Sequence, residues 1–208
     1  MPETPVPKTP VPKILSATAI WVAVVIAIAV PIGAAAMSPL LEWRDPVYIA
    51  AGFAGVLAMA LMLLQPLLAT GHLPGFAVPT GRRIHRWVGS LLFLTVVIHV
   101  AALWVTSPPD VVDALLFASP TPFSVWGVIA MWGVFATAVL AATRRKFRLQ
   151  PRTWRLSHKT LAAVIVAGSV IHAMLIEGTM ETVSKAVLCA LVLVVTLSVL
   201  AGVSFRKQ

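Results

Sequence analysis

The chain has 208 residues, of which 59% are hydrophobic and only 11% are charged, whereas a soluble domain carries about 25% charged residues. This composition excludes an ordinary soluble domain and indicates an integral membrane protein, and the single tyrosine and lack of strand-type alternation exclude a transmembrane barrel. The net charge of +9 does not indicate nucleic-acid binding, because the basic residues form short clusters between apolar runs, as membrane-edge anchors do.

The N-terminal segment is proline-rich and contains TPVPK twice, at 4–8 and 9–13. Such a segment adopts an extended, polyproline-like conformation without a packed core. We therefore expect residues 1–13 to form a cytoplasmic tail and residues 14–208 to form one transmembrane domain. The length leaves no room for a soluble nucleotide-binding domain, and no Gly-rich phosphate-binding motif follows a strand.

Six apolar segments follow the tail, and each has about 20 residues or more, enough to cross a hydrocarbon core of about 30 Å as a helix. They lie at about 14–37, 47–69, 84–106, 123–143, 156–176 and 183–203. The sequence thus predicts an all-α bundle of six transmembrane helices. Pro31 is expected to kink the first helix. The first segment ends in a run of alanines that resembles a signal-peptidase site, but its apolar stretch is long, which favours a retained helix.

The longest connection on the far side of the membrane is 107–122, with the sequence SPPDVVDALLFASPTP. Its middle can form a short amphipathic helix that lies at the interface. The segment is either a lid over an outer cofactor or a connector, and the connector is the simpler interpretation.

The distribution of Lys and Arg predicts the orientation. With a cytoplasmic N-terminus, fourteen basic residues fall on the cytoplasmic side and only Arg44 and Lys185 on the far side, which also holds six of the seven acids. The fourteen are Lys8, Lys13, Arg82, Arg83, Arg86, Arg144, Arg145, Lys146, Arg148, Arg152, Arg155, Lys159, Arg206 and Lys207. Both termini are therefore expected to be cytoplasmic, which agrees with an even number of helices.

Four histidines lie in predicted membrane helices: His85 and His99 in the third, and His158 and His172 in the fifth. Ionisable groups inside a membrane are costly, so they indicate function. Both pairs are 14 residues apart, which brings each pair within about 40° of one helix face and separates its members by about 21 Å. The third and fifth helices run parallel, so His85 can face His158 at one level and His99 can face His172 at another.

Two levels of facing imidazoles in an apolar bundle suit two haems, each with two axial histidine ligands to iron. The absence of a CxxCH motif excludes covalent attachment, which leaves b-type haem. Arg82, Arg86 and Arg155 flank the inner pair and can balance haem propionates, although simple headgroup anchoring explains each one equally well. His72 lies outside this arrangement and is expected to be a solvated interface residue, with a role near the inner haem or donor as the alternative.

Two segments, GRRIHRWVGSLLFLTVVIHV and WRLSHKTLAAVIVAGSVIHAMLIEGT, resemble the ferric-reductase-like transmembrane domain family. This family includes the membrane domains of ferric reductases and NADPH oxidases and the haem subunit of a methionine sulfoxide reductase system, and the resemblance extends over about 46–203. It implies electron transfer across the membrane through stacked b haems, with His85, His99, His158 and His172 as axial ligands. No FAD- and NADPH-binding extension follows the sixth helix, so the expected donor is a separate flavoprotein reductase or membrane quinol.

We therefore expect a multi-pass protein of a bacterial-type inner membrane that acts as the electron-transfer component of an oxidoreductase. Ferric iron, oxygen, quinone and a periplasmic partner protein are all compatible acceptors, and one haem in place of two is also compatible. Trp104 or Phe93 can line the route, although an aromatic residue in a membrane helix usually serves packing. The alternative functions are a haem-binding anchor or assembly subunit of a larger complex and, less consistent with the lack of buried carboxylates, a transporter.

Overall fold

The computed structural model describes residues 13–178 and 180–202, so the proline-rich tail expected at 1–13 lies almost wholly outside the described residues. Within them the chain is helical and has no strand. The elements are α1 (Lys13–Ala36), a 3-10 helix η1 (Pro39–Leu41), α2 (Pro46–Thr70), α3 (Val78–Thr106), α4 (Pro108–Leu115), α5 (Ser124–Thr143), α6 (Pro151–Leu175) and α7 (Thr182–Leu200).

Six of these helices, α1, α2, α3, α5, α6 and α7, are long and apolar enough to cross a membrane. The six-helix transmembrane bundle predicted from hydropathy is therefore confirmed. The eight-residue α4 lies in the 107–122 connection, where the sequence allowed a short amphipathic helix. Pro31 lies within α1 and does not end it.

Two helices begin earlier than the apolar segments indicated. α3 begins at Val78 and α6 at Pro151, six and five residues before the expected starts at 84 and 156. Each has a proline in its first two positions, where the missing N–H costs nothing and the fixed φ favours the helix. The added turns are rich in arginine, so hydropathy alone does not recognise them as helical.

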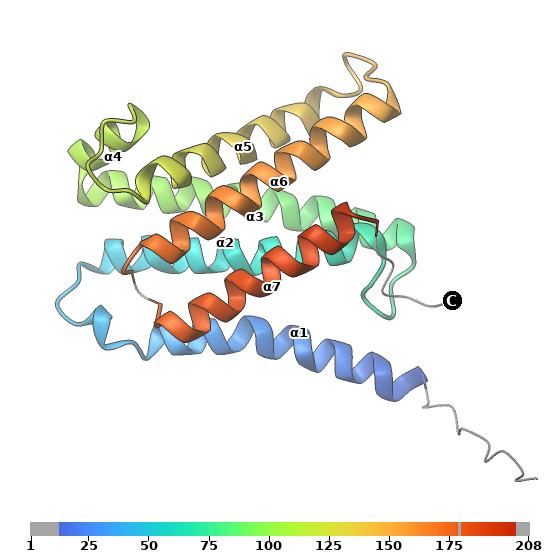
Figure 1. The fold of residues 1–208 in the computed structure, drawn as a ribbon, viewed down its shortest axis with the longest axis horizontal. Helices are drawn as coiled ribbons and strands as arrows, with labels where there is room; N and C mark the ends of the chain where they lie inside the picture. Colours follow the sequence, from blue (N-terminus) through green and yellow to red (C-terminus); the bar gives the residue numbers. More distant parts are fainter. Residues whose placement is uncertain (1–12, 179, 203–208) are drawn as a thin grey trace, which may run out of the picture.

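The bundle is built from two antiparallel hairpins, α2–α3 and α5–α6, as Figure 1 shows. α7 packs against both α2 and α6 and so links the hairpins, while α1 lies at the edge against α7 and α2. α3 packs closely on α2 but barely contacts α6. The two histidine-bearing helices are therefore held apart rather than packed on each other.

Glycines allow the close packing within each hairpin. A Cβ at Gly81 would lie 2.7 Å from the carbonyl oxygen of Leu68, and one at Gly168 would lie 2.9 Å from that of Trp126. Lipid removes most of the hydrophobic drive between membrane helices, so their association depends on such close backbone approach.

The centre of the bundle is filled by apolar side chains from α2, α5, α6 and α7. This central cluster consists of Met59, Met62, Leu63, Val134, Ile165, Val166, Val170, Leu188, Cys189 and Val192. Phe93 of α3 packs against it and meets Phe135 of α5 with ring centres 5.2 Å apart. The middle of the bundle is thus filled by apolar side chains.

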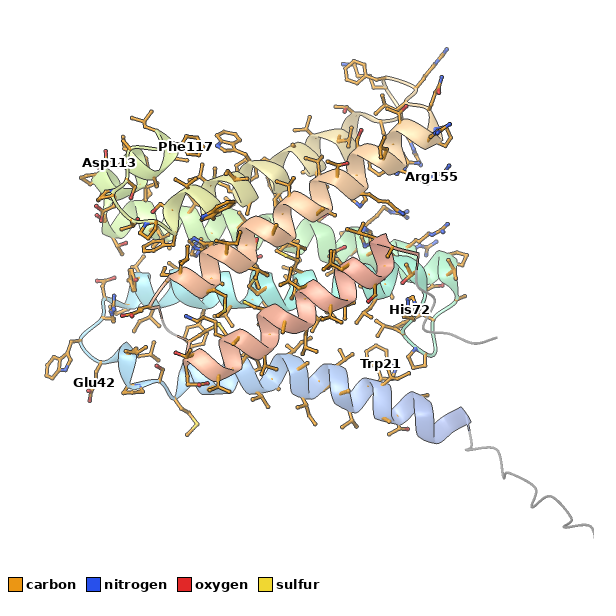
Figure 2. All side chains as sticks on the ribbon, viewed as in Figure 1. Trp21, Glu42, His72, Asp113, Phe117 and Arg155 are labelled. Carbon is orange, nitrogen blue, oxygen red and sulfur yellow. The ribbon has the colours of Figure 1, made fainter. Side chains whose placement is uncertain are left out.

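Charge divides the two ends of the bundle. The connections 71–77 and 144–150 lie at the end where α1 begins and α7 finishes, which we call the basic end (Figure 1). The opposite, acidic end holds the connections after α1, α3 and α6 and the residues Glu42, Asp45, Asp110, Asp113, Glu177 and Glu181. Figure 2 shows His72 and Arg155 at the basic end and Glu42 and Asp113 at the acidic end.

Candidate functional site

The four membrane histidines form two facing pairs across the space between the hairpins. The ring centres of His85 and His158 are 6.1 Å apart, and those of His99 and His172 are 6.4 Å apart. In each pair the two ring planes are nearly perpendicular, at 77° and 83°. The first pair lies toward the basic end and the second toward the acidic end, as the equal 14-residue intervals predicted.

Backbone carbonyls orient three of the four rings. Nδ1 of His85 donates to the carbonyl oxygen of Gln65 at 3.0 Å, and Nδ1 of His99 donates to that of Ala51 at 2.7 Å. Nδ1 of His172 donates to the carbonyl of Phe123 at 2.9 Å. A carbonyl can only accept, so Nδ1 carries the proton and Nε2 keeps its lone pair in each ring. This tautomer is the one that suits a metal ligand whose other nitrogen is anchored.

His158 is held differently. Its buried Nδ1 has no hydrogen-bond partner among the described residues, and its ring stacks on Trp154 with centres 5.2 Å apart and planes 14° from parallel. The guanidinium of Arg144 lies over the Trp154 ring, 4.8 Å from the centre of that ring. The pair at the basic end therefore has one ring fixed by a hydrogen bond and one by aromatic stacking.

Two glycines leave room for the rings at the acidic end. A Cβ at Gly127 of α5 would lie 2.7 Å from Nδ1 of His172, and a Cβ at Gly55 of α2 would lie 3.3 Å from Nδ1 of His99. The neighbouring hairpin helix thus approaches each imidazole so closely that a side chain at these positions would displace it.

The arrangement fits a metal ion held between two imidazoles. A ring nitrogen lies about 1 Å from its ring centre and a metal–imidazole bond is about 2 Å, so two rings on opposite sides of one metal have centres about 6 Å apart. The described residues contain no group of three or more His, Cys, Asp or Glu side chains that could enclose a metal. Two imidazoles on opposite sides of a metal can serve as the two axial ligands of an iron whose other positions are filled by a macrocycle.

The arginines expected to balance haem propionates lie on the outside of the bundle. Arg82, Arg86 and Arg155 are exposed at the basic end, near the His85–His158 pair in sequence.

His72 lies in the 71–77 connection, where its Nδ1 contacts the hydroxyl of Thr70, and it belongs to neither pair. Trp104 is 46% exposed on α3, whereas Phe93 packs on Phe135 between the two histidine levels.

Sequence reasoning did not single out several residues of this site. The carbonyls of Gln65, Ala51 and Phe123 have no sequence signature, because every residue carries a carbonyl. The roles of Gly55 and Gly127 depend on which helix packs beside them. Lys185, counted only as a far-side charge, is buried in the first turn of α7. The presence of a lysine within an apolar segment was the signal that could have found it.

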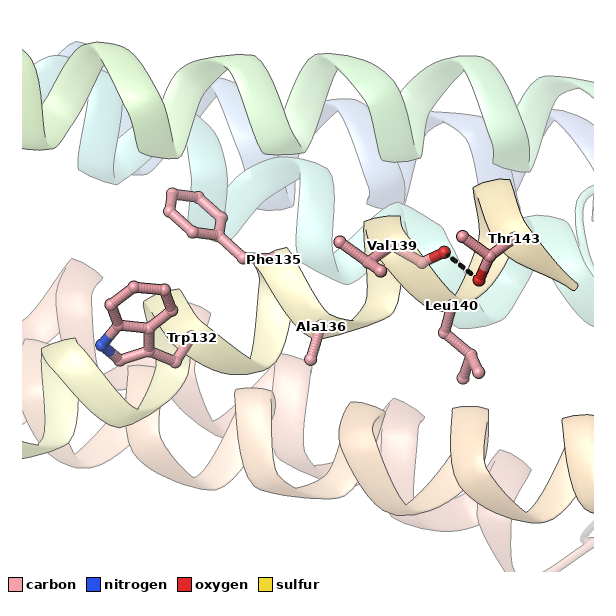
Figure 3. Close-up of a pocket in the computed structure, with 6 residues that line it drawn as sticks. All are labelled: Trp132, Phe135, Ala136, Val139, Leu140 and Thr143. Carbon is pink, nitrogen blue, oxygen red and sulfur yellow. Dashed lines mark hydrogen bonds between the residues drawn. The ribbon is translucent and has the colours of Figure 1, made fainter.

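An open surface hollow lies elsewhere. It has a volume of about 560 Å³ and lies along α5, lined by Trp132, Phe135, Ala136, Val139, Leu140 and Thr143 (Figure 3). The hydroxyl of Thr143 donates a hydrogen bond to the backbone carbonyl of Val139 in the same helix. None of the four histidines lines this apolar hollow, so it suits lipid chains rather than the candidate site.

Comparison with known proteins gives one match. The model of a family described as the ferric reductase like transmembrane component matches residues 51–169, more than half of the chain. The match includes three of the four paired histidines and ends shortly before His172. No curated protein and no solved structure is significantly similar to the chain. The extent of the family match shows that the chain belongs to the ferric-reductase-like transmembrane family.

Proposed function

We propose that this protein transfers electrons across the membrane through two bis-histidine b-type haems. His85 and His158 would hold the inner haem, and His99 and His172 the outer one. The observation that carries the proposal is the pair of imidazole separations, 6.1 and 6.4 Å, at two levels of one apolar bundle. Members of this family generally bind haem, which supports the same conclusion.

The protein's own residues prepare the sites. The carbonyls of Gln65, Ala51 and Phe123 fix the tautomer of their histidines and raise the basicity of the free nitrogen. When bound, haem supplies reversible one-electron chemistry at iron. The apolar central cluster would exclude water from the space between the two levels, so protons and ions would have no aqueous path through the bundle.

The spacing of the two pairs suits a membrane crossing. Fourteen helical residues span about 21 Å, which is most of a hydrocarbon core of about 30 Å. One site therefore lies toward each surface. Phe93 and Phe135, in contact at 5.2 Å, occupy the layer between the two levels.

The charge distribution supports a direction for the electrons. The basic end carries most of the described Lys and Arg residues, as cytoplasmic ends do, so the donor would act there. A separate flavoprotein reductase with an acidic surface or a membrane quinol fits this end, and the acceptor, including a periplasmic protein, would act at the acidic end. Arg82, Arg86 and Arg155 would balance the propionates of the inner haem. With this orientation, the protein would lie in a bacterial-type inner membrane.

Haem content is the first test. We expect the protein purified in detergent to carry two low-spin b haems per chain by the pyridine haemochrome assay. His85→Ala and His99→Ala should each lose about one haem, because an iron site with a single imidazole binds weakly. His72→Ala is the matched control, since His72 belongs to neither pair, and it should keep both. A folded, haem-supplemented protein without haem would refute the proposal.

A second test separates an electron conduit from a haem-binding anchor or assembly subunit. The haem-loaded protein is reconstituted into vesicles that enclose ferricyanide, and a reduced flavoprotein or a short-chain quinol is added outside. A conduit bleaches the enclosed ferricyanide, and His99→Ala abolishes this bleaching. An anchor subunit would contain both haems without transferring electrons across the vesicle membrane. The donor that supports the faster bleaching identifies the donor class.

A further inference from the structure

Lys185 is the one buried basic side chain among the Lys and Arg side chains that the structure describes. It is 7% exposed and lies in the first turn of α7, whereas the lysines and arginines between 44 and 159 are exposed. It lies on the inward face of α7, since this face also carries three residues of the central cluster, Leu188, Cys189 and Val192. The side chain therefore enters the bundle rather than the lipid.

The ammonium of Lys185 has one hydrogen bond and no ion pair. Its Nζ donates to the carbonyl oxygen of Ile176 at 2.8 Å, and no carboxylate among the described residues pairs with it. A buried charge without a partner of opposite sign is costly, and the positive end of the α7 dipole adds to the cost. An ammonium has three N–H donors, so two remain for a further partner.

The ammonium lies at the end of α6, the helix that carries His172 of the outer pair. Ile176, which accepts from Lys185, directly follows α6 and donates its own N–H to the carbonyl of His172 at 3.2 Å. Lys185 is thus bonded to a residue that lies one helical turn beyond a proposed haem ligand, toward the acidic end.

Among the residues that the structure describes, the acidic end offers no other cation for this place. Its six carboxylates are exposed, and its other basic residue, Arg44, is exposed and lies over the ring of Tyr48 at 4.9 Å. An anion at the outer pair would therefore depend on Lys185, whereas the inner pair has several arginines nearby.

We propose that Lys185 is the counter-charge for a carboxylate of the group held between His99 and His172. This inference rests on the proposed function, because a b-type haem brings two propionate carboxylates with it. Lys185 would keep its bond to Ile176 and donate a second N–H to a propionate, so that it would help to hold the haem at this site.

The test compares haem with haem dimethyl ester, in which both propionates are uncharged. His85→Ala leaves only the outer site, and binding of each haem form is measured by optical titration of this apoprotein and of the same protein with Lys185→Met. We expect Lys185→Met to weaken haem binding by about ten- to a hundredfold, the usual value of a hydrogen bond to a charged group, and to leave ester binding nearly unchanged. Lys185→Arg should restore most of the loss.

Arg44→Met is the matched control at the same end and should not change the ratio of haem to ester binding. Equal weakening of both forms by Lys185→Met would overturn the inference and leave Lys185 as a purely structural tie to Ile176. If Lys185→Met does not fold, equal binding of haem and ester by the parent protein would also overturn it. A parent protein that binds no haem would instead contradict the proposed function.

Discussion

At the residue scale, the feature that most constrains the site is the absence of a side chain beside two imidazoles. Gly127 and Gly55 each face a histidine of the outer pair so closely that any Cβ would be in tight contact with the ring. Alanine is a better helix former than glycine by about 0.5–1 kcal/mol, so local helix propensity would favour alanine at both positions. The space that the imidazole needs explains why glycine occurs at these positions, whereas helix propensity does not.

Gly127→Ala should therefore remove the outer haem while the helix itself becomes more favourable. The new Cβ would lie 2.7 Å from Nδ1 of His172, which must turn away and lose its bond to the carbonyl of Phe123. We expect roughly one haem less per chain by pyridine haemochrome. Gly33→Ala is the control, since a Cβ there meets nothing within 4 Å, and it should retain full haem content. Full haem content in Gly127→Ala would contradict the proposed geometry.

Trp154 takes the place of a hydrogen bond in orienting His158. Trp154→Leu removes the stack at 5.2 Å and leaves an imidazole whose Nδ1 has no acceptor among the described residues. We expect severalfold weaker haem binding at the inner site and little change at the outer one, measured by titration of the apoprotein. Trp87→Leu, at the same end but 74% exposed, should behave like the parent protein.

At the element scale, the acidic end depends on side-chain caps at helix starts. Asp45 caps α2, and its Oδ1 accepts from the N–H of Val47 at 2.7 Å. Glu181 caps α7 and accepts from the N–H groups of Ser184 and Val183, which hold the pKa of its carboxyl below the ordinary 4.5. Such caps stop backbone N–H groups at the membrane edge from being left without partners.

The Glu181 cap makes part of the stability depend on pH. Its pKa is lower in the folded state, so its contribution is complete above 4.5 and is lost as the pH falls through the lowered folded value. Glu181→Gln should therefore flatten the acid side of a plot of unfolding temperature in detergent against pH. Glu177→Gln, an exposed carboxylate that caps no helix, should leave the curve unchanged. An identical acid limb in Glu181→Gln would show that the cap does not contribute.

The proline-led first turns of α3 and α6 have a consequence at the same scale. They place the exposed Arg82 and Arg152 beyond the apolar part of their helices, where arginine would suit a membrane interface. Sequence hydropathy placed these helix starts too late because it measures transfer to hydrocarbon, and arginine at an interface remains helical without being apolar.

At the scale of the whole molecule, the separation of basic and acidic ends predicts orientation. Cys189 is the single cysteine, so Cys189→Ala gives a cysteine-free background. In this background, Ala118→Cys at the acidic end should react with a membrane-impermeant maleimide added to intact spheroplasts. Gln150→Cys at the basic end should react only after permeabilisation. The opposite labelling pattern would invert the proposed direction of electron transfer.

Much of this architecture could be predicted before any contact was known. Lipid requires each spanning segment to satisfy its own backbone and to be apolar throughout, so six spans can be read from local composition alone. The levels of His85, His99, His158 and His172 follow from helical periodicity and the parallel direction of α3 and α6. These are properties of single segments, and they do not depend on which helix lies beside which.

Only the tertiary structure decided how far apart the facing rings lie, which carbonyls orient them and which glycines leave room for them. It also decided that Lys185 is buried while the lysines and arginines between 44 and 159 are exposed. The physical reason is that these features arise where two hairpins meet, and the inward angle of each helix depends on side-chain packing with its neighbours. Hydropathy and periodicity determine that a helix crosses the membrane and which residues share a face, but packing determines what that face contacts.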